Sequence, residues 1–106
     1  MENNYPPLTE AIFYILLAVR RPLHGYGIIQ EVSEMTGGRV NLGPGTLYGA
    51  INSLLEKEWI VLYSADPGSR KKKEYVITDT GRMAFAAELR RLRELVSNGQ
   101  KMEENA

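Results

Sequence analysis

The chain has 106 residues, in which 13 Lys and Arg residues balance 13 Asp and Glu residues, so its net charge is zero. This length suits one small domain, and the balance excludes a uniformly basic nucleic-acid coat but allows a local basic patch. The absence of cysteine and the single histidine exclude disulfides and multi-histidine metal sites, so we expect no metal or cofactor. No apolar run approaches the about 20 residues of a transmembrane helix, and the N-terminus lacks the positive region of a signal peptide, which predicts a cytoplasmic protein.

The first two predicted elements are helices. The first begins after Thr9, a good N-cap, and ends near Arg20-Arg21, where Pro22 blocks its continuation. It is apolar on several faces, which is typical of a central core helix. The second helix covers residues 25–35 and is stopped by two glycines, because glycine adopts the left-handed conformation without steric cost.

The third predicted helix opens at Gly43-Pro44 and ends around Lys57. Proline suits its first turn, since the missing N–H would have no intrahelical partner there. An apolar stripe follows the helical period, and small or polar residues fall on or near the opposite face. The helix therefore has one face for a core and one face for a partner.

A β-hairpin is predicted next, from two strand-like runs at residues 60–63 and 74–77. The connection holds a Pro-Gly turn and four successive cations, Arg70, Lys71, Lys72 and Lys73. Residues 39–73 carry six cations and three anions, so the positive charge of the neutral chain is concentrated in this middle region.

The fourth predicted helix begins near Thr78 and ends at Asn98-Gly99. Its apolar residues step by four, three and four positions, as in a coiled-coil seam. The seam consists of Phe85, Leu89, Leu92 and Val96. Exposed on a lone helix, this stripe would favour aggregation, so we expect it to form a homodimer interface.

The order helix, helix, helix, hairpin, helix is typical of a winged helix-turn-helix protein. The predicted fold class is mainly α with a small β-hairpin, a winged helix-turn-helix plus a C-terminal dimerisation helix. Residues 1–78 are the expected DNA-binding domain, residues 79–98 the dimerisation helix and residues 99–106 a flexible tail. The third helix would enter the major groove of double-stranded DNA, and the cations of the wing would contact phosphates.

The predicted DNA contacts follow from this arrangement. Glycines let the backbone approach DNA closely, hydroxyl groups contact phosphates or bases, and asparagine pairs geometrically with adenine. The contact residues are Gly45, Thr46, Tyr48, Gly49, Asn52, Arg70, Lys71, Lys72 and Lys73. Simpler readings remain open: Tyr48 as a half-buried aromatic, the charge run as a solvated tip, and the whole domain as a protein–protein adaptor that does not bind DNA.

Four short motifs give the sequence a family resemblance. They are Leu23-His24-Gly25-Tyr26-Gly27-Ile28, Leu42-Gly43-Pro44-Gly45-Thr46-Leu47-Tyr48, Leu54-Leu55-Glu56-Lys57 and Tyr75-Val76-Ile77-Thr78-Asp79-Thr80-Gly81. In order and at these separations, they resemble the PadR family of transcriptional regulators over residues 8–97. The single C-terminal helix is similar to the short subgroup of that family, which includes multidrug-responsive repressors.

The resemblance implies a homodimer that binds a pseudo-palindromic operator, commonly as a repressor released by a small-molecule effector. Some relatives bind flat aromatic compounds at the dimer interface through a tryptophan of the C-terminal helix. This sequence departs from them, because its only tryptophan is Trp59, just after the third helix. We expect an effector site between the first and fourth helices, formed by Phe13, Tyr14, Met83 and Phe85.

Enzymatic activity is not expected from this sequence. A Ser-His-Asp set would need His24, the only histidine, and no carboxylate pair has a spacing that suggests acid–base catalysis. His24 lies at a predicted helix start, where it more often caps or packs than catalyses. Tyr26 and Trp59 are interpreted as core or interface residues.

Overall fold

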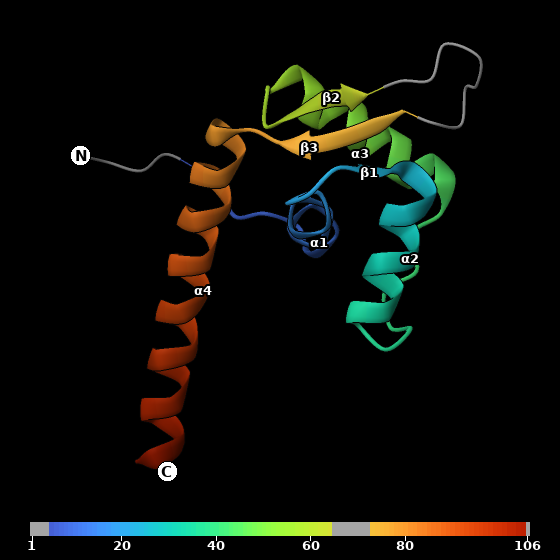
Figure 1. Cartoon of the computed structure of the whole chain (residues 1–106). Helices are drawn as coiled ribbons and strands as arrows, with labels where there is room; N and C mark the ends of the chain where they lie inside the picture. The colour runs from blue at the N-terminus through green and yellow to red at the C-terminus, as the bar shows by residue number, and fades with distance from the viewer. Residues whose placement is uncertain (1–4, 65–72, 106) are drawn as a thin grey trace.

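The computed structural model describes residues 5–64 and 73–105, which form a mainly helical fold with a small antiparallel sheet (Figure 1). In chain order the elements are α1 (Glu10–Ala18), β1 (Leu23–His24), α2 (Gly25–Met35), α3 (Pro44–Glu56), β2 (Ile60–Ser64), β3 (Glu74–Ile77) and α4 (Asp79–Glu104). The predicted class, helices with a β-hairpin between the third and fourth, is confirmed. No helix among these residues is both long and apolar enough to cross a membrane.

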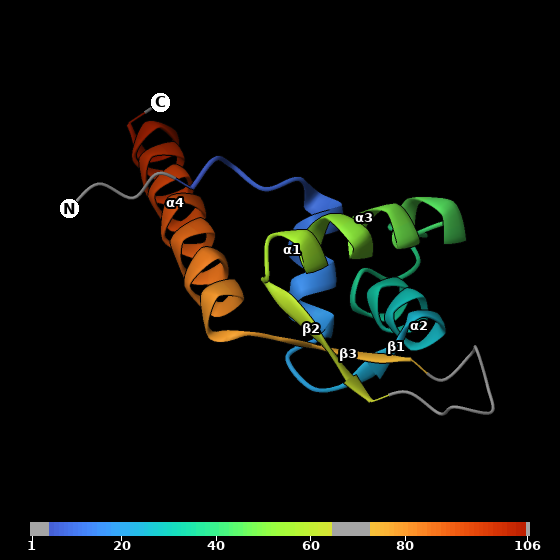
Figure 2. The same ribbon diagram turned by 90° about the horizontal axis from the view of Figure 1, so that it is seen from above.

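The short helix α1 lies at the centre of the molecule, as its apolar sequence predicts. Two views agree that α2 and α4 flank it on opposite sides, with the sheet running across one end (Figures 1 and 2). Ile15 and Leu16 of α1, and Val19 at its C-cap, are fully buried. They pack with buried side chains of the other elements, among them Ile28, Val32, Leu47, Ile51, Leu54, Ile60 and Ile77. One core therefore joins the helices to the sheet.

Side-chain caps fix where the first two helices begin. The Thr9 hydroxyl accepts a hydrogen bond from the Ile12 N–H at 3.1 Å, which confirms the predicted cap of α1. The His24 ring nitrogen Nδ1 accepts one from the Gly27 N–H at 3.0 Å, which confirms its predicted role as a cap. α1 ends at Ala18, two residues before the predicted end, because the chain must turn ahead of Pro22 to enter the sheet.

The sheet has one strand more than the sequence predicts. Its order is β1-β3-β2, and both pairings are antiparallel. The additional strand, β1, has only two residues, and Leu23 pairs with Tyr75 of β3. Two residues are too short to show the alternation that marks a strand in a sequence. β1 joins the α1–α2 connection directly to the hairpin.

The last helix, α4, continues to Glu104, so its predicted end at Asn98-Gly99 is wrong. Glycine ends a helix most effectively in the left-handed conformation, and among the described glycines only Gly37 and Gly38 have a positive φ. In a helical conformation glycine costs only about 1 kcal/mol relative to alanine, and good helix formers follow Gly99 from Gln100 to Glu104. The helical part of the predicted tail is therefore an extension of α4.

A buried carboxylate ties α4 to the segment before α1. Glu88 is 5% exposed and therefore buried. Arg91 donates two hydrogen bonds to its carboxylate, at 2.9 and 2.7 Å. These bonds, helped by the Leu8 backbone N–H, hold the pKa of Glu88 below its ordinary value, while burial opposes them.

We expect Glu88→Gln to lower the free energy of unfolding by about 2 kcal/mol at pH 7, because it removes charge-assisted hydrogen bonds. A lowered pKa means that this contribution is present above the unfolded value near 4.5 and is lost as the pH falls through the folded value. The gap between wild type and variant should therefore close below pH 4.5. Urea unfolding at pH 7 and pH 3 measures it, with the exposed Glu94→Gln as control; a gap that stays constant with pH would contradict the prediction.

Candidate nucleic-acid interface

Helix α3 divides its residues between the core and the surface. Leu47, Ile51 and Leu54 are almost completely buried, and their spacing of four and three places them on one face. Pro44 occupies the first turn, as predicted, and Gly43 at the N-cap makes no side-chain hydrogen bond. The helix is held by its apolar face, so its other face is available to a partner.

All five DNA-contact residues predicted on α3 lie on its exposed side. They are Gly45, Thr46, Tyr48, Gly49 and Asn52. Four of them are separated by three or four positions, so they share one helical face. The predicted exposure is confirmed, and the predicted DNA contacts remain predictions.

The glycines of α3 are not explained by packing inside the chain. A Cβ added to Gly45 or Gly49 would meet no other atom within 4 Å, and neither residue has a positive φ. Each nevertheless costs a helix about 1 kcal/mol relative to alanine. Gly25 is different, because a Cβ there would collide with a neighbouring side chain. Packing within the described residues therefore gives no reason for glycine at these two positions.

Tyr48 has both an exposed and a packed part. Its side chain is 48% exposed, yet a Cβ on Gly25 would lie 2.4 Å from its hydroxyl oxygen. The phenol group of Tyr48 therefore lies against the first turn of α2. The half-buried interpretation and an outward contact are both compatible with this position.

Tyr26, the neighbour of that contact, is 64% exposed, which excludes the core alternative of its predicted role and leaves the interface alternative as a prediction. It lies in the first turn of α2, between Gly25 and Gly27. The sequence signal for this exposure is the pair of glycines that flank Tyr26 at the helix start, because they provide no side chains for its ring to pack against. Trp59, in contrast, is half-buried and stacks edge-on with Tyr5.

The hairpin that would form the wing is present, with β2 paired to β3. Lys73 is exposed immediately before β3. The other predicted cations, Arg70, Lys71 and Lys72, lie outside the described residues. In sequence they belong to the connection between the two strands, so all four cations lie within four positions of the start of β3.

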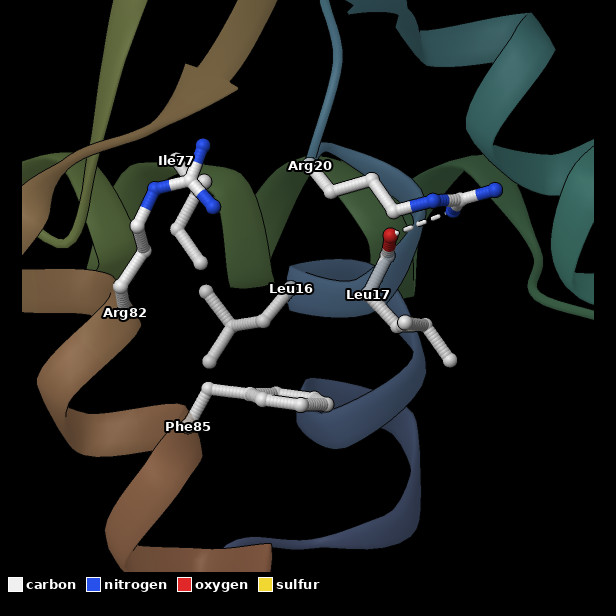
Figure 3. A pocket seen from close by; sticks show the side chains of 6 residues that line it. All are labelled: Leu16, Leu17, Arg20, Ile77, Arg82 and Phe85. Atoms are coloured by element: carbon white, nitrogen blue, oxygen red, sulfur yellow. Dashed lines mark hydrogen bonds between the residues drawn. The ribbon is translucent and has the colours of Figure 1, made fainter.

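Three of the four predicted effector residues meet where α1 crosses α4. Phe13 stacks on Phe85 with ring centroids 4.7 Å apart, and Tyr14 is edge-on to Phe13 at 5.6 Å. Phe13 and Tyr14 line a pocket of about 300 Å³, whereas Phe85 lines a separate pocket of about 310 Å³ (Figure 3). Met83 lines neither of them. The structure therefore brings three residues together around an aromatic stack but does not gather all four in one cavity.

The predicted dimer seam lies along α4. Phe85, Leu89 and Leu92 are half-buried within the chain, and Val96 is 57% exposed. Leu89, Leu92 and Val96 line an open apolar groove of about 320 Å³. An apolar groove on a protruding helix is a surface that association would cover.

Known proteins show the same fold and sequence pattern. The family model for the "Transcriptional regulator PadR-like family" matches residues 14–87. A curated Lysinibacillus sphaericus protein, named "Uncharacterized protein X", is 35% identical over 74 residues, which are 69% of this chain and 67% of that protein.

Solved structures of known proteins have the same fold as this chain. A PadR family transcriptional regulator from Eggerthella lenta has a TM-score of 0.75 at 20% identity, covering 90% of this chain and 82% of that one. Bacillus subtilis PadR in complex with operator DNA has a TM-score of 0.67 at 24% identity, covering 78% of this chain and 48% of that one. At these identities the likeness shows the fold, which confirms the winged helix. The family consists of transcriptional regulators rather than enzymes, as the sequence predicts. The chain therefore belongs to the PadR-like family of transcriptional regulators.

Proposed function

We propose that this regulator binds DNA as a homodimer, recognises a pseudo-palindromic operator and represses a gene until a small molecule releases it. The observation that carries the DNA-binding part is the exposed face of α3, with Gly45 and Gly49 at positions that internal packing does not require. The Bacillus subtilis relative was captured with operator DNA, which supports the same partner for this chain.

Base reading is assigned to the polar residues of the same face. Asn52 and Thr46 are both exposed on α3. Asn52 lies about one helical turn from Gly49, and Thr46 is next to Gly45 in the sequence. Asparagine can form two hydrogen bonds with adenine in the major groove, and a threonine methyl or hydroxyl can contact a base edge. Cations of the wing would add sequence-independent attraction to phosphates.

Two parts of α4 support the proposed dimerisation and effector release. Its seam would hold a second copy, since an isologous dimer presents the same surface twice and matches the symmetry of a palindromic operator. A small aromatic effector would bind near the Phe13–Phe85 stack, because ligand sites need an apolar cavity and pockets flank this stack.

An electrophoretic mobility shift with the DNA upstream of the regulator's own gene tests the proposal. We expect a mobility shift at low salt, and we expect unrelated competitor DNA to reduce it only weakly. A domain that shifts no DNA at any salt concentration would instead be a protein–protein adaptor.

Asn52→Ala and Thr46→Ala should change the preference among operator variants. Loss of a bidentate contact removes about 1–3 kcal/mol of discrimination at one base pair, or roughly ten- to hundredfold. Binding to a panel of operators that each carry one changed base pair measures this. Asn105→Ala, which removes the same amide from the far end of α4, is the matched control. A uniform loss across the panel would mean that these residues touch only the DNA backbone.

A further inference from the structure

The segment before α1, residues Tyr5–Thr9, lies between α4 and the end of α3, and we call it the strap. Both views show it leaving the side of α4 and reaching the start of α1 (Figures 1 and 2). Pro6 and Pro7 favour an extended backbone here, because proline fixes its own φ and restricts the residue before it. Such a stretch acts as a semi-rigid spacer, so movement at one end of it reaches the other.

The C-terminal half of the strap is attached to α4. The Leu8 N–H donates a hydrogen bond to the carboxylate of Glu88, which Arg91 holds in place from the other side. The Leu8 side chain packs against the core. A backbone N–H at such a position loses free energy when its acceptor is removed. The position of Leu8 therefore depends on Glu88 of α4.

The N-terminal half of the strap is attached to the end of α3. The rings of Tyr5 and Trp59 meet edge-on with their centroids 6.0 Å apart. The way in which α3 ends brings Trp59 back to the last turn: Glu58 has a φ of 61°, and the Trp59 N–H donates to the Leu54 carbonyl at 3.0 Å. The Lys57 ammonium lies 5.4 Å from the centroid of the same indole ring. The aromatic residue that follows α3 therefore contacts the strap.

The strap also forms a wall between two pockets. Leu8 and Thr9 line the pocket of about 300 Å³ that contains Phe13 and Tyr14 and lies against α4. The same two residues line a second pocket of about 160 Å³, whose other side is formed by Trp59 and the last turns of α3. A ligand in the first pocket would therefore press on a wall that the end of α3 shares.

We propose that the strap is a positioning element that couples the pocket between α1 and α4 to the end of α3, through Leu8 at one end and Tyr5 at the other. This coupling rests on the proposed function, because it gives the effector site a route to the DNA-binding face. Coupling between distant sites needs a chain of packed contacts, and the strap supplies one. It acts beside the junction at Thr78, where α4 meets the backbone of Trp59.

The fluorescence of Trp59, the only tryptophan of the chain, reports on the strap without DNA and without an effector. Tyr5→Ala should expose the indole ring to water, which red-shifts its emission maximum and strengthens its quenching by acrylamide. Tyr5→Phe keeps the ring contact and should restore the wild-type signal. An unchanged signal in Tyr5→Ala would overturn the proposal at its first step.

The coupling itself is tested from α4. Glu88→Leu removes the acceptor of the Leu8 N–H, so it should strengthen the quenching of Trp59, although Glu88 lines the first pocket and Trp59 the second. The matched control is Glu94→Leu, the same replacement at an exposed position of α4, which should leave the quenching unchanged. Measurement well below the unfolding transition of each variant keeps lost stability out of the comparison. Equal quenching in Glu88→Leu and the wild type would refute the coupling.

A loosened strap distinguishes this route from the junction at Thr78. The P6G/P7G variant keeps both attachments and makes the link between them flexible. In that background Glu88→Leu should have no further effect on the quenching of Trp59. A persisting effect would mean that the change travels through the Thr78 junction instead, and the strap would lose its proposed role.

DNA binding gives the last readout. We expect P6G/P7G to bind the DNA upstream of the regulator's own gene about fivefold more weakly than the wild type, which is the low end of typical couplings between sites. Unchanged affinity, with DNA binding intact, would contradict transmission to α3. A wild-type chain that binds no DNA would remove the proposed function, whereas the quenching results would still decide whether the strap couples α4 to Trp59.

Discussion

Gly81→Ala is expected to destabilise the protein by about 3 kcal/mol, a large share of the stability of a small domain. Gly81 lies in the first turn of α4, where the helix passes close to the chain that enters β2. A Cβ at this position would lie 2.1 Å from the Trp59 carbonyl oxygen and 2.8 Å from a side-chain carbon of Ile77. Backbone cannot move aside cheaply, because the Thr78 N–H donates to that same carbonyl at 2.9 Å.

The matched control is Gly49→Ala, since a Cβ on Gly49 meets nothing within 4 Å. Alanine should stabilise α3 there by up to about 1 kcal/mol. The same substitution should nevertheless weaken DNA binding if the partner backbone approaches this face closely. Thermal and urea unfolding at equal protein concentration measure both variants. Equal effects of the two substitutions on stability would refute the close contact at Gly81.

Neutralising the wing, by changing Arg70, Lys71, Lys72 and Lys73 to glutamine, should lower DNA affinity about a hundredfold or more at 0.1 M salt. Each phosphate contact that is lost removes about 0.9 from the slope of log K against log salt concentration, so four contacts flatten it by between three and four. The loss should be the same for operator and unrelated DNA, because phosphates carry no sequence information.

The control for the wing replaces two exposed cations of α4, in the variant R90Q/K101Q. It reduces the net charge but leaves the hairpin intact, so the salt slope should stay unchanged. Titration by fluorescence anisotropy at several salt concentrations gives both slopes. An unchanged slope in the wing variant would exclude these cations from the DNA interface.

The elements that the sequence predicts most closely are those with local signals at their ends. α2 begins after His24 and ends before two glycines with positive φ, while α3 begins at Pro44. β1 escaped prediction because its two residues are extended only through pairing with β3. The predicted end of α4 comes too early because a glycine costs a helix interior only about 1 kcal/mol and does not by itself end the helix.

The candidate interface could be predicted as a helical face but not as a set of contacts. Periodicity alone separates Leu47 and Ile51 from Thr46 and Asn52, and the structure bears out that separation. It cannot show that Tyr48 lies against Gly25, or that Glu88 is buried, because those contacts join segments far apart in the sequence. The contacts of Tyr48 and the burial of Glu88 therefore depend on long-range packing, which the sequence pattern does not show.

The single residue between β3 and α4, Thr78, has a mechanical consequence. Its hydroxyl accepts a hydrogen bond from the Gly81 N–H and donates one to the Glu58 carbonyl at 2.6 Å. These two bonds fix the junction between β3 and α4. α4 is then a rigid lever arm: its 26 residues span about 39 Å, and a tilt of about 5° at this corner moves the far end by about 3 Å. In the proposed homodimer, a small change beside Phe85 would therefore change the spacing of the two α3 helices.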